Sequence, residues 1–257
     1  MEPKTRSAGG EHILYDASAL QNPQEELWPR GERGAGADDP AVGAGDPGRG
    51  AVRFRALADG TQAVLRHYRR GGWIAHLSRD RYLGLALERT RPWREWRLLA
   101  HLYRLGLPVP RPVAARVVRA GPAYRGDLAT ARLPGCRTLG QILQGEALAP
   151  AGWERVGRTI RRFHDAGAEH PDLNAHNVLL DADGGVYLLD FDRGRLRRPA
   201  GRWQRANLRR LRRSLDKLAG ETGNFHFKDE DWAVLLEGYA GEEGPEGPAG
   251  LSAGAEG

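Results

Sequence analysis

Three oxygen-bearing side chains lie close together in the sequence between residues 170 and 192. Asp172 and Asn177 precede a short apolar segment, Asp190 follows a second one, and the sequence DADGG separates the two segments. Two short apolar segments around such a turn predict a β-hairpin. Because the residues that flank a hairpin meet at its open end, we expect Asp172, Asn177 and Asp190 to converge there.

These residue types suit the transfer of a phosphoryl group to an alcohol. Asp172 would accept the proton of the attacking hydroxyl, while Asn177 and Asp190 would hold Mg²⁺ against the phosphate. The string H-x-D-x-x-x-x-N is complete from His170 to Asn177, and Asp190-Phe191 follows the hairpin. The combination resembles the catalytic loop and the metal-binding Asp-Phe pair of the protein-kinase superfamily, which implies ATP as the phosphate donor.

Two structural interpretations compete with this one. Asp172 and Asn177 could serve only as turn formers or a helix cap, with Asp190 terminating a strand. The DADGG sequence also begins like a calcium loop, but apolar residues 186–188 occupy positions where further oxygen ligands would be needed. We therefore interpret DADGG as a hairpin turn.

A kinase also needs a glycine-rich turn that covers the nucleotide phosphates. Gly48 and Gly50 precede the strand expected from Val52 and could form that turn, since glycine lets the backbone approach a ligand closely. The surrounding segment is rich in glycine throughout, so a plain linker explains the same residues equally well.

The basic residue that binds the phosphates is predicted to be an arginine. Arg66 stands where a kinase would carry a lysine, with Arg69 and Arg70 as alternatives. Arginine has the same charge and binds phosphate through two nitrogens. Glu95 is the expected partner that orients it, unless Glu95 is an exposed carboxylate paired with a helical neighbour such as Arg94.

Turn and periodicity signals indicate the elements that would position these side chains. Residues 52–58 and 62–68 flank an Ala-Asp-Gly-Thr turn and should pair as strands, and a further strand is expected at 127–133. Helical spacing of apolar residues predicts amphipathic helices at 91–105, 152–166 and 203–218. The expected apolar positions of the first helix are Trp96, Leu99, Leu102, Tyr103 and Leu105.

The order of these elements predicts an α+β, two-lobed, protein-kinase-like fold. A small, mainly β N-lobe with one helix precedes a larger, mainly α C-lobe. The expected divisions are an N-terminal segment of the N-lobe (1–28), a flexible Gly-rich loop (29–50), the rest of the N-lobe (51–134), the C-lobe (135–240) and a disordered tail (241–257).

Composition limits the classes of protein to consider. With 257 residues, 40% of them apolar and 28% charged, the chain is typical of a globular protein and not of a disordered one. Its first residues lack a secretory apolar stretch, and no run of apolar residues is long enough to span a bilayer, which favours the cytoplasm. The single cysteine, Cys136, excludes an intrachain disulfide.

The net charge of +6 favours anionic partners, although a solvated basic surface has the same composition. The helix expected at 203–218 concentrates this charge on one side. That side would hold the protein near anionic lipid or would bind the acidic groups of an acceptor. Its leucines are 208, 211, 215 and 218, and its arginines are 205, 209, 210, 212 and 213.

Several segments of the chain resemble the 3-deoxy-D-manno-octulosonic acid (Kdo) kinases of Gram-negative bacteria, within the lipopolysaccharide core kinases. The similar segments include ILYDAS, LRHYRRGG, ERTRPWREWRLL, GLPVPRP, HPDLNAHNVLLD, LDFDRGRLR and NLRRLRRSLDKL. The resemblance implies transfer of the ATP γ-phosphate to the 4-hydroxyl of Kdo on Kdo-lipid A. It further implies a peripheral protein at the cytoplasmic face of the inner membrane, with no nucleic-acid partner. Two residues depart from the pattern: Pro171, and Asp192 where glycine would follow Asp-Phe.

Two other functions remain open from the sequence. One is a phosphotransferase of the same fold that acts on another small molecule or on a protein. The other is a non-catalytic basic module that binds a membrane or nucleic acid. An intact set of Asp172, Asn177 and Asp190 argues against the second function, and Arg66 in place of lysine argues faintly for it.

Overall fold

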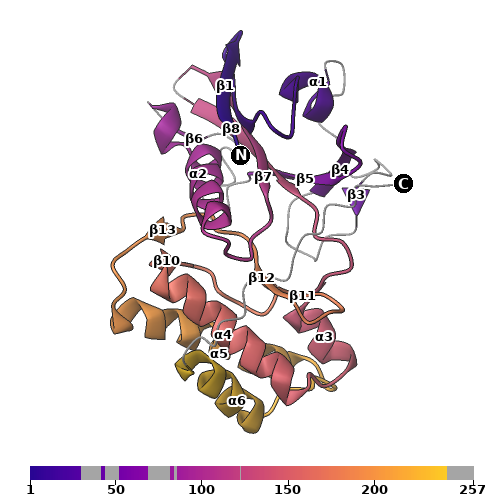
Figure 1. Cartoon of the computed structure of the whole chain (residues 1–257), viewed down its shortest axis with the longest axis vertical. Coiled ribbons are helices and arrows are strands. Elements are labelled where there is room, and N and C mark those ends of the chain that lie inside the picture. The colour runs from indigo at the N-terminus through magenta and orange to yellow at the C-terminus, as the bar shows by residue number, and fades with distance from the viewer. Residues whose placement is uncertain (30–41, 44–51, 69–81, 84–85, 122, 242–257) are drawn as a thin grey trace, which may run out of the picture.

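Strands form the upper lobe of the computed structural model and helices form most of the lower one (Figure 1). The structure describes residues 1–29, 42–43, 52–68, 82–83, 86–121 and 123–241. Apart from Pro29 and residues 42–43, the predicted loop 29–50 lies outside these ranges, and so does the predicted tail from residue 242 onward.

The upper lobe is built on an antiparallel sheet, which has eight strands within the described residues. The hairpin predicted around Ala-Asp-Gly-Thr is confirmed, and a backbone bond from the Leu57 N–H to the Thr61 C=O closes its turn at 2.8 Å. The strands in sheet order are β1 (Pro3–Ala8), β2 (Glu11–Asp16), β7 (Pro112–Ala120), β8 (Ala123–Ala131), β5 (Gln62–His67), β4 (Val52–Ala56) and β3 (Val42–Gly43), with β6 (Tyr82–Leu83) paired to β8.

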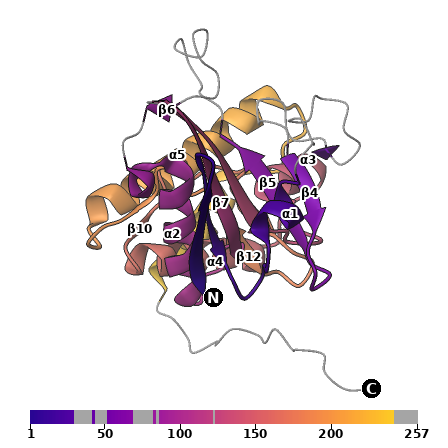
Figure 2. The ribbon, with the colours of Figure 1, turned by 90° about the horizontal axis from the view of Figure 1, so that it is seen from above.

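Each face of this sheet buries a different cluster of apolar residues. Leu14 packs with the helix α2 (Arg91–Arg104), whereas its neighbour Ile13 packs with Leu27 of the short helix α1 (Pro23–Leu27). Successive strand residues point to opposite faces, so alternation along β2 produces both contacts. Figure 2, seen from above, shows α1 and α2 on opposite sides of the strands.

The helix predicted at 91–105 is confirmed as α2, which a short 3₁₀ turn (Leu87–Arg89) precedes. Trp96, Leu99 and Leu102 are buried as expected. The prediction for Leu105 is wrong, because the helix ends at Arg104 and the Leu105 side chain is 53% exposed. Its backbone turns away from the helical path, so the spacing no longer determines which way the side chain faces.

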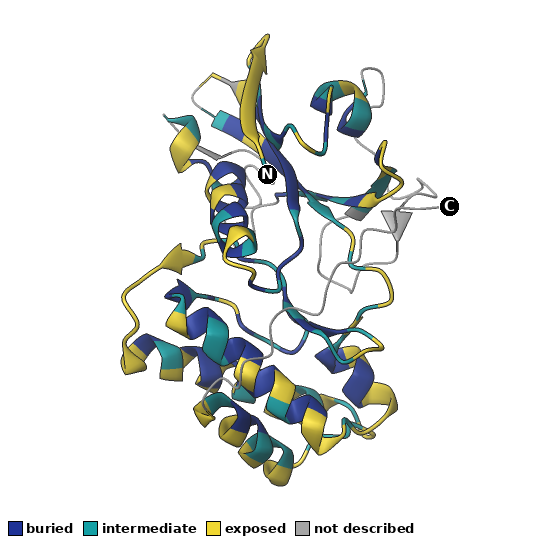
Figure 3. Cartoon of the chain, in the orientation of Figure 1, coloured by how far each residue is buried: buried dark blue, intermediate teal, exposed yellow. Residues whose placement is uncertain are grey.

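Helices dominate the lower lobe, where most buried residues face the space between them (Figure 3). The helix predicted at 152–166 is confirmed as α4 (Pro150–Asp165), and Trp153, Val156, Ile160 and Phe163 on it are buried. The lower lobe contains α3 (Leu139–Gly145), α4 (Pro150–Asp165), α5 (Gly201–Glu221) and α6 (Asp229–Ala240), with the short strands β9 (Arg137–Thr138), β10 (Ala168–Glu169), β11 (Val178–Leu180), β12 (Val186–Leu188) and β13 (Arg195–Leu196).

The two lobes share one continuous apolar cluster. Leu98 of α2 and Phe191 beyond β12 belong to the same buried group. A backbone bond from the Leu188 N–H to the Pro108 C=O measures 3.0 Å and ties the segment after α2 to β12. The predicted α+β, two-lobed, kinase-like fold is confirmed, and its hairpin lies directly below the sheet lobe (Figure 1).

Candidate active site

The predicted hairpin is present as β11 and β12. Val178 pairs with Leu188 and Leu180 with Val186, and all four side chains are buried. At the turn, the Asp181 carboxylate accepts the Gly185 N–H at 2.7 Å and the Tyr187 hydroxyl at 3.0 Å. These bonds are internal to the hairpin, in agreement with the interpretation of DADGG as a turn.

A set of hydrogen bonds holds the loop 170–177 against the far end of this hairpin. The Asn177 side-chain amide donates to the Asp172 carbonyl at 2.9 Å, and the Leu189 N–H donates to the Asn177 carbonyl at 2.9 Å. Asp190 follows Leu189 directly. The three predicted residues Asp172, Asn177 and Asp190 therefore meet where the hairpin opens.

His170 fixes the same loop from inside the protein. Its Nε2 lies 2.7 Å from the Leu189 carbonyl, which can only accept, and its Nδ1 lies 3.2 Å from the Asp172 N–H, which can only donate. The ring must then be neutral with its proton on Nε2. Burial lowers the pKa of His170, which supports the neutral form. Through these two contacts His170 holds the loop against the segment after β12.

Helix α5 supplies two polar side chains that the sequence analysis missed. The His170 N–H donates to Asn207 Oδ1 at 3.1 Å, and the Ala175 N–H donates to Ser214 Oγ at 3.2 Å. Asn207 and Ser214 are two helical turns apart and share the side of α5 that carries its buried leucines. A polar residue within that apolar stripe, such as Asn207, was the available sequence signal.

Among the predicted site residues that the structure describes, Asp172 is the most exposed, with 65% of its side chain accessible. Its carboxylate lies 4.0 Å from the guanidinium of Arg210, which is itself 46% exposed. A carboxylate in that setting is open to a substrate from solvent. In the sequence, Arg210 is only one arginine of a basic helix, and no local pattern indicates that it adjoins Asp172.

Arg66, Glu95 and Asp190 come together between the lobes. Arg66 Nη2 donates to both Glu95 carboxylate oxygens at 2.6 Å, and Nη1 donates to Asp190 Oδ1. Glu95 is buried and pairs with Arg66, so the alternative of an exposed Glu95 paired with Arg94 is wrong. One guanidinium thus joins β5, α2 and the residue beyond β12.

Burial raises the pKa values of Glu95 and Asp190, and the Arg66 guanidinium that they share lowers them. Burial raises the pKa of Glu95 to about 7, although the adjacent Arg66 partly offsets the effect. Burial would also raise the pKa of Asp190, but Arg66 outweighs it and the pKa falls below its usual value. Asp190 therefore remains a carboxylate at neutral pH.

The donor set fits a magnesium ion. Asp190 offers Oδ2, for which no hydrogen bond to any described residue is recorded, and Asn177 carries a side-chain amide oxygen. Mg²⁺ prefers such oxygen ligands and is commonly bound by one or two protein groups plus substrate phosphates. Asp190 also has a positive φ of 62°, a strained conformation that concentrates at functional sites.

Three further residues of this region, Arg91, Asp192 and Tyr68, make contacts that the sequence did not predict. The Arg91 guanidinium holds Asp192 through two bonds, one of them 2.9 Å from Nε to Oδ1. The Tyr68 hydroxyl donates to Glu95, and its ring centroid lies 5.0 Å from the Arg66 guanidinium carbon and 5.2 Å from that of Arg91. Asp192, which replaces a glycine, was the one visible signal.

Part of the predicted nucleotide-binding site lies outside the described residues. This part consists of Gly48 and Gly50, and of Arg69 and Arg70, which are the alternatives to Arg66. The described part of the chain contains an exposed carboxylate, an ion pair between the half-buried Arg66 and the buried Glu95, and oxygen donors of the kind that magnesium prefers. Phosphoryl transfer requires groups of these types: a proton acceptor, a cation for phosphate and oxygen ligands for a metal.

Comparison with known proteins agrees with this chemistry. Residues 40–239 match a family model described as the lipopolysaccharide kinase (Kdo/WaaP) family. A 3-deoxy-D-manno-octulosonic acid kinase of Xylella fastidiosa (strain 9a5c) is 46% identical over 209 residues, which cover 81% of this chain and 82% of that protein. One of the same name from Xanthomonas axonopodis pv. citri (strain 306) is 44% identical over 239 residues, covering 93% of each.

Proposed function

The chain belongs to the lipopolysaccharide kinase (Kdo/WaaP) family, a family of phosphotransferases with an alcohol acceptor, and from that premise we propose that it transfers the γ-phosphate of ATP to the 4-hydroxyl of a Kdo residue on Kdo-lipid A. The names of its relatives support Kdo as the sugar that accepts the phosphate. The observation that carries the reaction is the exposed Asp172 carboxylate beside the Arg66–Glu95–Asp190 group.

Each side chain has one role in this proposal. Asp172 accepts the proton of the sugar hydroxyl as that oxygen attacks the γ-phosphorus. Arg66 binds the phosphates of ATP while Glu95 holds its guanidinium in place, and Gly48 and Gly50 cover the phosphates from the segment before β4. Asn177 and Asp190 hold Mg²⁺, which when bound neutralises charge on the transferring phosphate.

The acceptor's own charge supports a role for Arg210. Kdo is an acid, and its carboxylate needs a cation near the base that deprotonates its hydroxyl. Arg210 lies 4.0 Å from Asp172 and both are exposed, so a sugar acid bound to Arg210 would have its hydroxyls beside Asp172. Guanidinium binds a carboxylate through two parallel hydrogen bonds, which also orients the sugar.

We place this activity at the cytoplasmic face of the inner membrane, where a peripheral enzyme could reach a lipid-linked sugar. In the described part of the chain, no helix has the length and apolar character needed to cross a bilayer. The net charge of +6 favours association with an anionic surface.

One reaction tests the proposal. The purified protein is incubated with ATP, Mg²⁺ and Kdo-lipid A, and the product is examined by mass spectrometry for one added phosphate and by fragmentation for its position on the Kdo ring. Lipid A without Kdo, an aminoglycoside and a protein substrate serve as competing acceptors. Phosphate found only on one of these acceptors, or on another Kdo hydroxyl, would contradict the proposal.

An Asp172→Asn variant tests the role of the base in the same reaction. We expect the rate to fall roughly 100- to 10,000-fold, because the amide cannot accept the proton. The unfolding midpoint should stay near that of the wild type, since Asp172 is exposed. Asp183→Asn, an exposed change at the hairpin turn, is the matched control. Wild-type turnover by Asp172→Asn would remove Asp172 from this role.

A further inference from the structure

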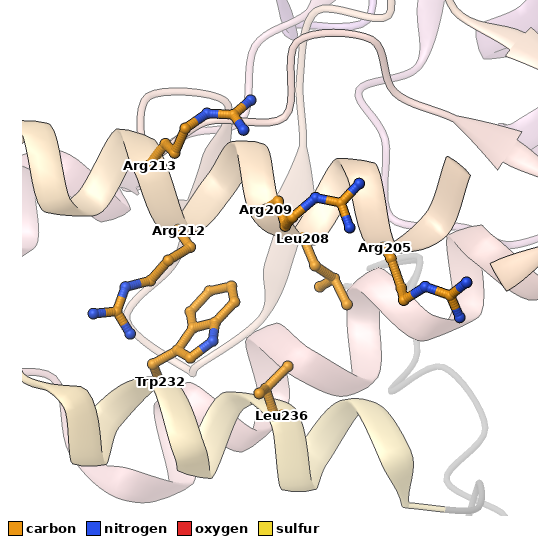
Figure 4. A pocket seen from close by; sticks show the side chains of 7 residues that line it. All are labelled: Arg205, Leu208, Arg209, Arg212, Arg213, Trp232 and Leu236. Atoms are coloured by element: carbon orange, nitrogen blue, oxygen red, sulfur yellow. The ribbon is translucent and has the colours of Figure 1, made fainter. Parts of the chain in front are cut away.

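A pocket of about 360 Å³ lies between α5 and α6, apart from the residues proposed for catalysis. Figure 4 shows its construction: Leu208 points from α5 toward α6, while Trp232 and Leu236 point from α6 toward α5. The four remaining lining residues all lie on α5: Arg205, Arg209, Arg212 and Arg213. The α5–α6 pocket is therefore apolar at its base and cationic along one edge.

Three of the four arginines carry charge that the described residues do not neutralise. Arg212 is paired with Asp216 at 2.8 Å and with Asp229 at 2.5 Å. Arg205, Arg209 and Arg213 are exposed, and no ion pair with any described residue is recorded for them. They stand four residues apart, so they form one row along the helix with about 6 Å between successive positions.

The α6 side contributes an exposed apolar strip. Leu236 is 39% exposed, and Ala233, three residues before it on the helix, is exposed too. Acidic residues also occur on α6: Asp229, one turn before this strip, is paired with Arg212, while Glu230 and Glu237 are exposed. A row of cations next to uncharged apolar side chains matches the boundary between lipid headgroups and acyl chains.

We propose that the α5–α6 pocket is the surface through which the protein docks on an anionic phospholipid bilayer. Arg205, Arg209 and Arg213 bind headgroup phosphates, and Leu236 with Trp232 enters the upper acyl region. This inference rests on the proposed function, because an enzyme that acts on a lipid-linked acceptor must reach that acceptor at a membrane. It adds which face of the protein meets that membrane.

The position of this surface relative to Asp172 supports the same partner. Arg210 follows Arg209 on α5 and reaches Asp172, and the inner side of the same helix holds the loop 170–177 through Asn207 and Ser214. Docking α5 on a bilayer would therefore hold the proposed base close to the headgroup layer. A sugar attached to a lipid in that layer would need to extend only a short way to reach it.

Vesicle binding tests the proposal independently of catalysis. The full chain is mixed with vesicles of phosphatidylcholine alone or with one third phosphatidylglycerol, and the bound fraction is measured by flotation at low and high salt. We expect binding only to the anionic vesicles. The triple variant Arg205→Gln/Arg209→Gln/Arg213→Gln should bind roughly a hundredfold more weakly, at about fivefold for each lost cation.

Matched variants separate this surface from general charge and apolarity. Arg89→Gln/Arg94→Gln/Arg97→Gln removes three exposed arginines from and just before α2 and should bind as the wild type does. Leu236→Gln should weaken binding, whereas Leu105→Gln, at the 53% exposed leucine after α2, should not. Equal losses in the pocket and control variants, unchanged binding by the pocket variants, or no wild-type binding to anionic vesicles would each overturn the proposal.

Failure of the proposed function would give a different result. Vesicle binding requires neither ATP nor an acceptor, so Asp172→Asn should float with vesicles like the wild type. Conversely, the Arg205/Arg209/Arg213 variant should phosphorylate Kdo-lipid A dispersed in detergent, where no bilayer is present, at the wild-type rate. A pocket variant that lost activity on detergent-dispersed Kdo-lipid A would show that the row of arginines serves the sugar site instead, and would overturn the docking role.

Discussion

At the scale of single residues, Arg66 is the most informative departure from the expected kinase pattern. Its guanidinium uses Nη2 for both oxygens of Glu95 and Nη1 for Asp190, so one side chain joins two carboxylates on different lobes. An ammonium group is a compact point charge without this fixed fork of donors. Arginine at this position thus supplies a geometry that lysine does not reproduce.

Replacing Arg66 by lysine tests that geometry. We expect kcat/KM for ATP to fall at least roughly tenfold in Arg66→Lys, because the shorter head group cannot bind Glu95 and Asp190 together as the guanidinium does. Steady-state kinetics at saturating acceptor measures the effect. Arg94→Lys, on the exposed side of α2, should leave kcat/KM unchanged. Equal kinetics for Arg66→Lys and the wild type would mean that charge alone matters at this position.

At the scale of elements, the packing of α4 on α6 depends on glycines. A Cβ placed on Gly157 of α4 would lie 2.1 Å from the Leu235 carbonyl oxygen, and one on Gly238 of α6 would lie 2.3 Å from the Glu154 carbonyl oxygen. Both contacts are with backbone atoms, which cannot rotate away. The two helices approach this closely only because neither position carries a side chain.

A Gly157→Ala variant distinguishes this packing from helix propensity. Propensity alone would make alanine about 1 kcal/mol more stable in a helix, but we expect a net loss of about 1–3 kcal/mol because the helices must separate. Denaturant unfolding measures the difference. Gly220→Ala in α5, where a Cβ would meet nothing within 4 Å, should instead stabilise by up to about 1 kcal/mol. A stabilised Gly157→Ala would refute the packing argument.

At the scale of the whole molecule, two cations connect the lobes across the proposed nucleotide site. Arg66 reaches Asp190 from β5, and Arg91 reaches Asp192 from the start of α2. Asp192 therefore anchors the segment beyond β12 at the position where glycine was expected. A ligand held between these groups would contact both lobes, so its binding would stabilise the whole fold.

Thermal unfolding with and without Mg²⁺-ATP tests this coupling. At a nucleotide concentration a hundredfold above Kd, the wild type should gain about 2.7 kcal/mol. Asp190→Ala should gain little, because it removes the proposed metal ligand, while Asp183→Ala at the exposed hairpin turn should behave as the wild type. An equal gain for Asp190→Ala, or isothermal calorimetry showing unchanged Mg²⁺-ATP affinity, would contradict a ligand role for Asp190.

The sequence by itself determined several of the elements and the residues that could perform the chemistry. Periodicity identified α2, α4 and α5, and the turn signals identified both hairpins, because local spacing dictates which side of an element is apolar. The motif around Asp172, Asn177 and Asp190 could be found for a related reason: a hairpin of known length brings its flanking residues together without any information about distant segments.

Only the tertiary structure decided which residues from distant segments meet. Four contacts of the site join separate elements. They are the Arg91–Asp192 pair, the Tyr68–Glu95 bond, the hydrogen bond from loop 170–177 to Asn207 and the approach of Arg210 to Asp172. Such contacts depend on how helices and strands pack, and local spacing carries no record of that packing. For the same reason, a basic stripe on α5 became a defined pocket only when α6 was seen to lie against it.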